Sequence, residues 1–226
     1  MWNRNRIGIA AILVMFLWDV FVIRYQKASC ATGMLPRCYP TGETYPYRDA
    51  QGRTQYDSIY HTIAPFKLTD QNGHIYTSDS LKGKIYVANF FFCNCKSICP
   101  KMTNYMLFLQ KEFKGNENVR FLSHTVDPEN DSVPVLKRYA QQYNIEERQW
   151  HLLTGSRSEL YDLSKHSYYL GVASDNPDYF EHSEKFVLVD ANGIIRGYYN
   201  GTDSIDVEKL KNDIKTILNN NKNKML

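Results

Sequence analysis

The pattern that most constrains this chain is a pair of cysteines between a predicted strand and a predicted helix. Residues 85–92 form an almost continuous apolar run, typical of a strand that is buried on both faces. Cys95 and Cys99 follow it, and Pro100 then opens a helical pattern, because proline is favoured at the first position of a helix. The free N–H groups and the dipole at a helix N-terminus favour a thiolate. We therefore expect two reactive thiols that can form a disulfide or bind a soft metal ion.

The neighbours of this pair argue against cysteines that merely fill a core. Asn94, Lys96 and Ser97 are polar, whereas inert structural cysteines are usually buried in apolar surroundings. Cys93 lies two residues before Cys95. Along an extended strand, two such side chains point to the same side, so a third thiol is expected beside the pair.

The first thirty residues predict a membrane anchor. Residues 7–23 form an apolar stretch that only Asp19 interrupts, and about 20 apolar residues, with a range of ~17 to 25, span a bilayer. Arg4 and Arg6 precede the stretch and favour a cytoplasmic N-terminus. A cleaved signal peptide is the alternative, but small residues suited to cleavage are poorly placed. Without an Arg- and Ser-rich presequence, we expect a single-pass protein of the bacterial inner membrane whose domain faces the periplasm.

Charge and cysteine usage limit the partners of the outer domain. Residues 1–30 carry the whole formal net charge of +3, and the remainder balances 23 Lys and Arg against 23 Asp and Glu. A domain without net positive charge lacks the excess of Lys and Arg that nucleic-acid-binding surfaces need. All five cysteines lie at or beyond Cys30, on the oxidising side of the predicted anchor. Cys30 and Cys38 flank a short loop and can pair there as a structural disulfide, although spacing alone leaves that pairing open.

The predicted organisation is an anchor (1–25), a linker (26–62), an α/β domain (63–220) and a polar tail (221–226). The linker is rich in Tyr, Pro and Gly and has no sustained hydrophobic period. The domain is expected to contain a hairpin around 66–77, a strand at 85–92, a helix at 100–115, a strand at 119–126, a helix at 131–143, a strand at 150–153, a helix at 158–169, a hairpin at 186–199 and a helix at 207–218. This alternation predicts a mainly parallel central sheet with helices on both faces and a final antiparallel hairpin. With a thiol pair after the first core strand, it is the arrangement of a thioredoxin-like fold.

The order strand, Cys-x-x-x-Cys-Pro, helix resembles the Sco/SenC family of membrane-anchored copper chaperones. The family motif falls on Cys95, Cys99 and Pro100, the segment after its second strand resembles residues 125–131, and its metal-binding histidine falls on His182. The resemblance covers the outer domain as well as the anchor. It implies a thioredoxin-like domain, tethered by one transmembrane helix, that serves assembly of the copper site of cytochrome c oxidase.

The resemblance also implies a copper site formed by Cys95, Cys99 and His182. Cu(I) is soft and prefers thiolate, whereas Cu(II) also accepts imidazole, so this set can hold either state. Asp127 is expected to orient a ligand without binding the metal, although its sequence context is equally typical of an ordinary turn and helix cap. His124, at a predicted strand end, is the next candidate ligand, and we expect it to be structural.

Two departures from the family pattern favour redox chemistry as well. Lys96 stands where the family usually has proline, and Cys93 stands where it usually has a hydroxyl residue. A lysine can lower a neighbouring thiol pKa, and a third thiol can compete for metal or form a wrong disulfide. Cys95 and Cys99 are therefore also expected to be a redox-active pair with a reversible disulfide, which excludes bound copper.

Two functions follow as alternatives. The leading prediction is a copper-binding metallochaperone, more a carrier than an enzyme, whose partner is the copper-site subunit of cytochrome c oxidase or another copper protein. It can also reduce the cysteines of that partner. The alternative is an enzyme, a membrane-tethered thiol–disulfide oxidoreductase without a copper role, which would have no need of His182.

Overall fold

The structure is a computed structural model that describes residues 35–49, 51–170 and 183–223. The chain separates into two compact units, one formed by residues 1–36 and 216–226 and the other by residues 37–215. The second unit contains the sheet and the two thiols of the predicted motif. The predicted anchor at 7–23, like Cys30 and His182, lies outside the described residues. Of the helices that the structure does describe, none combines the length and the apolarity needed to cross a membrane.

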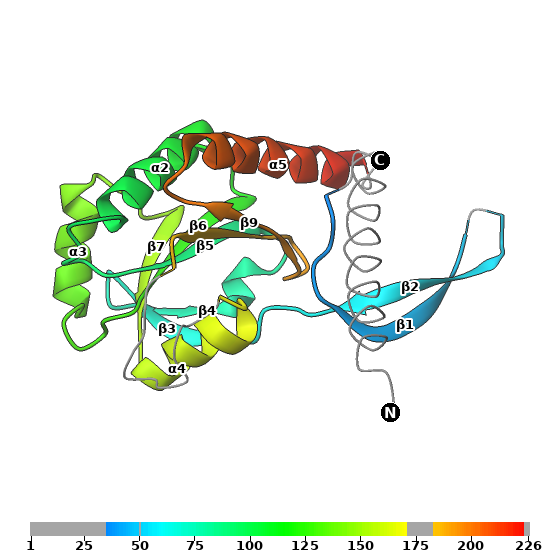
Figure 1. Ribbon diagram of the computed structural model, residues 1–226, viewed down its shortest axis with the longest axis horizontal. Coiled ribbons are helices and arrows are strands. Elements are labelled where there is room, and N and C mark those ends of the chain that lie inside the picture. Colours follow the sequence, from blue (N-terminus) through cyan, green and yellow to red (C-terminus); the bar gives the residue numbers. More distant parts are fainter. Residues whose placement is uncertain (1–34, 50, 171–182, 224–226) are drawn as a thin grey trace, which may run out of the picture. The chain divides into compact units, whose positions relative to one another are not determined.

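Seven strands form one mixed sheet in the order β4-β3-β7-β6-β5-β8-β9 (Figure 1). Its centre is parallel, because β5 pairs in parallel with β6, and β6 with β7. The outer pairs are antiparallel, including the final pair of β8 and β9. The strands are β3 (Lys67–Asp70), β4 (Ile75–Thr77), β5 (Ile85–Phe91), β6 (Val119–Thr125), β7 (Trp150–Thr154), β8 (Lys185–Val189) and β9 (Ile195–Asn200). The predicted terminal hairpin is confirmed. The prediction of a mainly parallel sheet is wrong, because among the described strands only the two central pairs are parallel and the other four are antiparallel.

The helices lie where the breaks in the sequence pattern predict them. Proline occupies the first turn of both α2 and α3, and the Ser156 hydroxyl caps α4 by accepting a hydrogen bond from the backbone N–H of Glu159, as helix starts favour. Figure 1 shows α2 and the first part of α5 on one side of the sheet and α4 on the other. The helices are η1 (Ser78–Leu81), α2 (Cys99–Glu112), α3 (Val133–Gln142), α4 (Arg157–Asp162), the π-helical turn η2 (Leu163–Ser167) and α5 (Ser204–Asn223). With helices on both faces of a mixed sheet, the predicted thioredoxin-like fold is confirmed.

Strand β5 divides the core into two layers. All seven of its residues are buried, and alternate side chains of a strand point to opposite faces. Tyr86, Ala88 and Phe90 belong to the hydrophobic cluster that Leu160 and Leu163 enter from α4 and η2. Met102, Met106 and Leu109 of α2 are buried as well but do not belong to that cluster, and Figure 1 shows α2 on the side of the sheet opposite α4. The continuous apolar run of the sequence reflects this burial on both sides.

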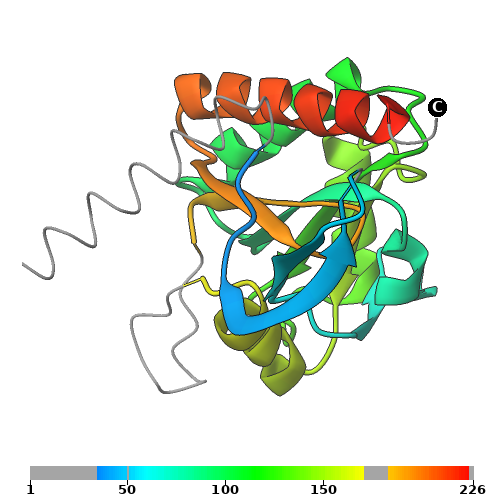
Figure 2. The same ribbon diagram turned by 90° about the vertical axis from the view of Figure 1, so that its right-hand side faces the viewer.

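Part of the predicted linker has regular structure. Strands β1 (Pro40–Arg48) and β2 (Thr54–Tyr60) pair as a separate two-stranded antiparallel sheet. Figure 1 shows this pair beside the seven-stranded sheet, and Figure 2 shows it on the side that faces the viewer. Every residue of β1 is exposed. Of strand β2 only Tyr60 is buried. A hairpin with so little buried surface needs no alternation of apolar and polar residues, which is why the sequence pattern did not predict these strands.

Candidate functional site

The predicted thiol pair lies where β5 is connected to α2, with Cys95 in the loop and Cys99 as the first residue of the helix. Strand β5 ends at Phe91, and the backbone N–H of Cys95 donates a hydrogen bond to the carbonyl oxygen of Phe92 at 3.3 Å. Residues 92–95 therefore form a turn and do not continue the strand. The prediction that Cys93 and Cys95 point to the same side assumed an extended strand, and this turn removes its basis.

Both thiols of the pair are buried beneath polar neighbours. Cys95 is 7% exposed and Cys99 is 1% exposed, whereas Asn94 and Lys96 are exposed. The Cys95 Sγ atom lies 3.5 Å from the Ser97 Oγ atom. The polar residues around the cysteines thus face solvent, while the two thiols themselves are buried. Polar neighbours in the sequence were therefore no sign that the thiols are exposed.

The two thiols differ in acidity. Burial alone would raise the pKa of Cys95, but hydrogen bonds from the Ser97 hydroxyl, the Cys99 thiol and two backbone N–H groups lower it to about 7. Burial raises the pKa of Cys99 to about 12, and the neighbouring Cys95 charge adds to the effect. The predicted stabilisation of a thiolate at the helix start thus holds for Cys95, and it is wrong for Cys99. Hydrogen bonds, and not the charge of Lys96, are the main cause of the Cys95 shift.

Asp131, which the sequence places at the start of the predicted helix at 131–143, binds the backbone of the third cysteine, Cys93. The backbone N–H of Cys93 donates to both Asp131 carboxylate oxygens, at 3.1 and 3.3 Å, and the Thr125 hydroxyl donates to one of them at 2.5 Å. Burial, followed by the charge of Asp131, raises the pKa of Cys93 well above its usual value. Cys93 is therefore a neutral thiol at neutral pH.

The topology offered a signal for this contact. Phe91 at the end of β5 is paired with Thr125 at the end of β6, and the carboxyl ends of neighbouring parallel strands lie at the same edge of a sheet. The loop with Cys93 and the loop with Asp131 must therefore meet, although 38 residues separate the two positions. A polar residue in the second loop is thus a natural partner for the first.

Asp127 lies in the same loop but has other hydrogen-bond partners. Its carboxylate oxygens accept hydrogen bonds from the Asn130 side-chain amide, both at 3.0 Å, and its backbone N–H donates to the Thr125 hydroxyl. The carbonyl oxygen of Asp127 also accepts the N–H of Asp131 at 2.8 Å. These contacts form a local turn, and the predicted role in orienting a ligand stays a prediction.

His124 lies in an aromatic cluster on the other face of the sheet. Its ring stacks on Phe90 with centroids 4.9 Å apart, and the rings of Phe66 and Tyr168 also contact it. It is fully buried, and its Nε2 atom has no hydrogen-bond partner among the described residues. Burial lowers the pKa of His124 to about 4. These surroundings support the predicted structural role.

The remaining predicted site residues are described only in part. His182, the expected third copper ligand, lies outside the described residues. Within the ranges that the structure does describe, no three His, Cys, Asp or Glu side chains are grouped to hold a metal. Cys38 is partly buried against the hydrophobic cluster and forms no disulfide with another described cysteine. Its predicted partner Cys30 is not described, so this pairing stays a prediction.

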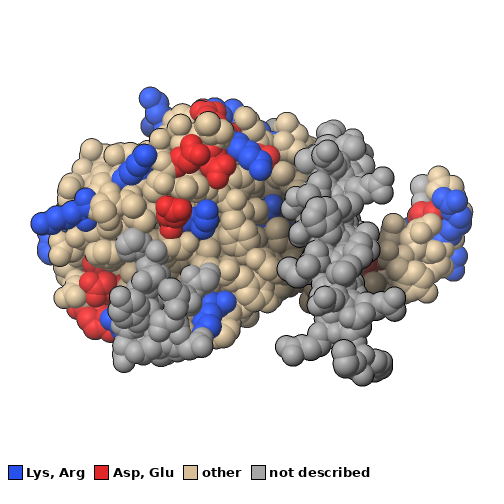
Figure 3. Space-filling view, viewed as in Figure 1, with Lys and Arg blue, Asp and Glu red and all other residues tan. Residues whose placement is uncertain are grey.

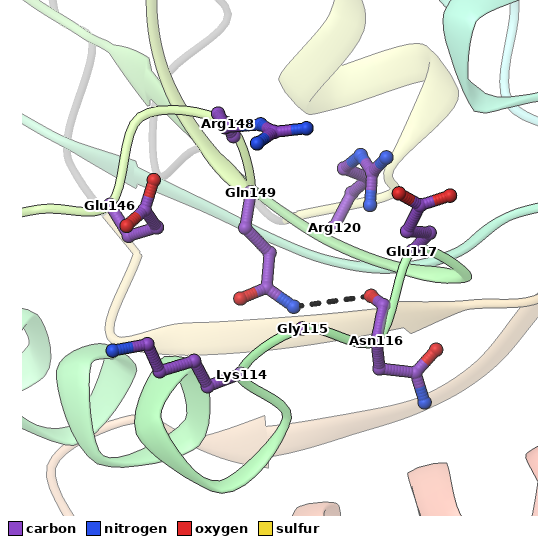
Figure 4. A pocket seen from close by; sticks show the side chains of 8 residues that line it. All are labelled: Lys114, Gly115, Asn116, Glu117, Arg120, Glu146, Arg148 and Gln149. Atoms are coloured by element: carbon purple, nitrogen blue, oxygen red, sulfur yellow. Dashed lines mark hydrogen bonds between the residues drawn. The ribbon is translucent and has the colours of Figure 1, made fainter.

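A surface pocket lies at the opposite ends of the parallel strands from the thiols. It has a volume of about 250 Å³ and lies where β6 and β7 begin (Figure 4), whereas the cysteines follow the end of the parallel strand β5. Its lining contains neither cysteine nor histidine, and the Gln149 amide donates across it to the Asn116 carbonyl oxygen. The lining residues are Lys114, Gly115, Asn116, Glu117, Arg120, Glu146, Arg148 and Gln149. This pocket is not part of the thiol site.

The described domain is similar in sequence to a known protein family and to curated relatives. The family model described as SCO1/SenC matches residues 54–219. The chain is 36% identical over 163 residues to the SCO1 protein homolog of Bacillus subtilis (strain 168), which covers 71% of this chain and 84% of that protein.

Solved structures of similar proteins cover the same part of the chain. A SCO1/SenC family lipoprotein from Bacillus anthracis str. Ames aligns with a TM-score of 0.63 and 33% identity, over 70% of this chain and 95% of that one. BsSco, described as a member of the Sco family of cytochrome c oxidase assembly proteins with a disulfide switch, aligns with a TM-score of 0.61 and 36% identity, over 70% and 93%. Copper-bound ScoI of Bradyrhizobium japonicum aligns with a TM-score of 0.57 and 26% identity, over 69% and 99%.

Proposed function

Since the chain belongs to the SCO1/SenC family, we propose that it binds copper at Cys95 and Cys99 and delivers it during assembly of the copper site of cytochrome c oxidase. The observation that carries the proposal is the acidity of Cys95, whose pKa of about 7 leaves a thiolate at neutral pH next to the Cys99 thiol. A thiolate is the form of cysteine that binds metal. Related proteins that are described as copper-bound or as oxidase assembly factors support the same role.

The difference in acidity suggests an order of binding. Cys95 captures the ion as a preformed thiolate, and Cys99 loses its proton as it joins, because thiol ligands must be deprotonated. The imidazole of His182 is the proposed third ligand. Two thiolates and one imidazole suit both Cu(I) and Cu(II) and leave a coordination position through which a partner can take the ion.

Copper titration of the reduced full chain tests this proposal. We expect one copper ion per chain and a thiolate-to-copper absorption band in the Cu(II) form. The Cys95→Ser and Cys99→Ser variants should lose both, whereas Cys38→Ser, which removes a thiol outside the pair, should keep both. Undiminished copper binding by the double variant Cys95→Ser/Cys99→Ser would contradict the proposal.

A second function, thiol–disulfide exchange, is favoured by the same pair. A thiolate with a pKa near ambient pH is the optimum attacking group, and a neighbouring thiol can resolve the mixed disulfide that results. Cys95 and Cys99 match these two roles in their pKa values. The reduced protein would prepare the cysteines of a partner for metal and would itself end with a Cys95–Cys99 disulfide. Cys99→Ser should then trap a mixed disulfide between Cys95 and the partner, which Cys95→Ser should not form.

The proposed site of action is the outer face of a bacterial inner membrane. Residues 7–23 serve as a single-pass anchor, with the N-terminus in the cytoplasm and the domain in the periplasm. A similar protein of Bacillus anthracis is described as a lipoprotein, which supports membrane attachment of this chain. On the face shown in Figure 3, Lys and Arg side chains lie among Asp and Glu side chains, in keeping with a protein partner and no nucleic acid. Protease added to spheroplasts should digest the domain, and protection would contradict the orientation.

A further inference from the structure

We propose that Asp131 is a specificity-determining residue, whose buried negative charge makes the site favour Cu(II) over Cu(I). This inference rests on the proposed copper binding at Cys95 and Cys99. It concerns a residue that touches no predicted ligand directly but is bonded to the loop that carries Cys95. Three features support it, namely the contacts of the carboxylate, its missing counter-charge and the net charge of the loaded site.

The contacts fix the Asp131 carboxylate against the thiol loop. Asp131 is only 2% exposed, and its oxygens accept hydrogen bonds from the Cys93 backbone N–H and from the Thr125 hydroxyl. Both oxygens act as acceptors, as they do in an ionised carboxylate. Burial raises the pKa of Asp131, and the hydrogen bonds from the Thr125 hydroxyl and the Cys93 backbone N–H lower it and so favour the charged form. The charge acts on the pair, because it contributes to the raised pKa of Cys99. The α3 N-cap is Ser132, and it shows no side-chain capping bond.

The charge of Asp131 is not neutralised within the described part of the chain. Neither lysine, arginine nor histidine forms an ion pair with it there, although the neighbouring exposed Glu129 pairs with Arg157 at 2.6 Å. Neutral donors stabilise a buried carboxylate without cancelling its charge. In surroundings of low dielectric constant, such a charge acts strongly on other charges nearby.

The oxidation state of copper decides how the loaded site responds to this charge. Two thiolates give a net charge of about −1 with Cu(I) and about zero with Cu(II), and neutral further ligands do not change this difference. A fixed negative charge therefore raises the energy of the Cu(I) form relative to the Cu(II) form. Removing the charge should strengthen Cu(I) binding relative to Cu(II) binding.

The experiment compares Cu(I) and Cu(II) dissociation constants of the full chain by competition with chelators at one pH. Asp131→Asn keeps the shape and an acceptor oxygen but removes the charge, and we expect the ratio of Cu(I) to Cu(II) affinity to rise about tenfold, equal to about 59 mV for a one-electron couple. Asp131→Glu keeps the charge and should keep the ratio, even if both affinities fall. Glu129→Gln removes a charge from the same loop at an exposed position and should leave both constants unchanged.

The outcomes separate this inference from the proposed function. If Asp131→Asn lowers both affinities equally, Asp131 only positions the loop, and the inference is wrong. If Asp131→Asn does not fold, Asp131→Ser, a smaller neutral acceptor, takes its place, and an unchanged ratio overturns the inference there too. If the unaltered chain binds neither ion, the proposed copper function itself fails.

Discussion

Ionisable groups are buried on both faces of the sheet where the neighbouring strands β5 and β6 end, and the surroundings on the two faces are opposite. The thiol loop surrounds its groups with donors, since Cys95 receives hydrogen bonds from Ser97 and Cys99 and the Asp131 carboxylate accepts bonds from backbone and hydroxyl. His124, on the other face, is enclosed by aromatic rings, and one of its nitrogens has no partner among the described residues. Burial with donors keeps a charged form available, whereas burial among rings excludes it.

The largest expected effect is the difference in reactivity between the two thiols of the pair. With pKa values of about 7 and about 12, Cys95 should be alkylated at least about a thousandfold faster than Cys99 at pH 7. The Cys95 rate should rise as the pH increases through 7 and then level off, because the thiolate fraction saturates. Mass spectrometry of brief alkylation at several pH values measures both rates, and initial labelling of Cys99 would refute the assignment.

The burial of His124 among aromatic rings predicts that the protein loses stability in acid. The folded-state pKa of His124, about 4, lies below its unfolded value of about 6.5. The unfolded chain therefore binds a proton first, and stability falls as the pH drops from about 6.5 to about 4. His124→Phe should remove about 3 kcal/mol of that loss.

Urea unfolding at pH 7.5 and pH 4.5 measures this change in the free energy of unfolding. His166→Gln is the control, because His166 is exposed and should keep the acid dependence of the unaltered chain. Equal acid sensitivity of His124→Phe and the unaltered chain would show that His124 is not the titrating group.

A smaller change in the free energy of unfolding is expected when the single hydroxyl donor of Thr125 is removed from Asp131. Thr125→Val removes the hydroxyl that donates to Asp131 at 2.5 Å and keeps the volume of the side chain. Hydrogen bonds to charged groups contribute about 1.5–3 kcal/mol, so the free energy of unfolding should fall by about 2 kcal/mol at pH 7. Thr202→Val is a matched control, because its hydroxyl bonds a neutral amide oxygen of Asn200 and should cost about 1 kcal/mol. Equal losses in both variants would mean that the Asp131 bond is an ordinary one.

The smallest effect should come from the charge that the sequence places between the two thiols. Lys96 is exposed, and solvent and salt screen exposed charges. Lys96→Gln should therefore change the alkylation rate of Cys95 by less than about threefold at physiological ionic strength. A larger decrease that disappears in high salt would restore Lys96 as a cause of the Cys95 acidity.

The parts of the fold that the sequence predicted are those that bury side chains in a regular pattern. The apolar run at β5, the proline in the first turn of α2 and the hairpin of β8 and β9 all follow from periodicity and helix-start chemistry. Strands β1 and β2 lacked such a pattern because β1 is fully exposed and β2 buries only Tyr60. The π-helical turn at η2 was also not predicted, because it continues the same side-chain pattern as the preceding helix.

The candidate site was predicted in part, for a related reason. The thiol pair has a local signature, because an apolar run precedes Cys95 and Pro100 follows Cys99. The turn at residues 92–95 depends on a backbone hydrogen bond, and the contact between Cys93 and Asp131 depends on two loops meeting across adjacent strands. Neither feature can be recognised from neighbouring residues in the sequence. Their effects on the pKa values of the thiols therefore became visible only in the three-dimensional structure.

The pairing of Phe91 with Thr125 decides which side chain of β6 reaches the thiol side. Because side chains alternate along a strand, shifting β6 by one residue against β5 would exchange the two faces. Thr125 would then enter the aromatic cluster, and His124 would turn toward the cysteines, where an imidazole is a good ligand for copper. The register of β6 against β5 thus determines which side chain lies near the cysteines. It keeps the His124 imidazole, a candidate competing copper ligand, on the opposite face of the sheet, and it places the Thr125 hydroxyl where it donates to the Asp131 carboxylate.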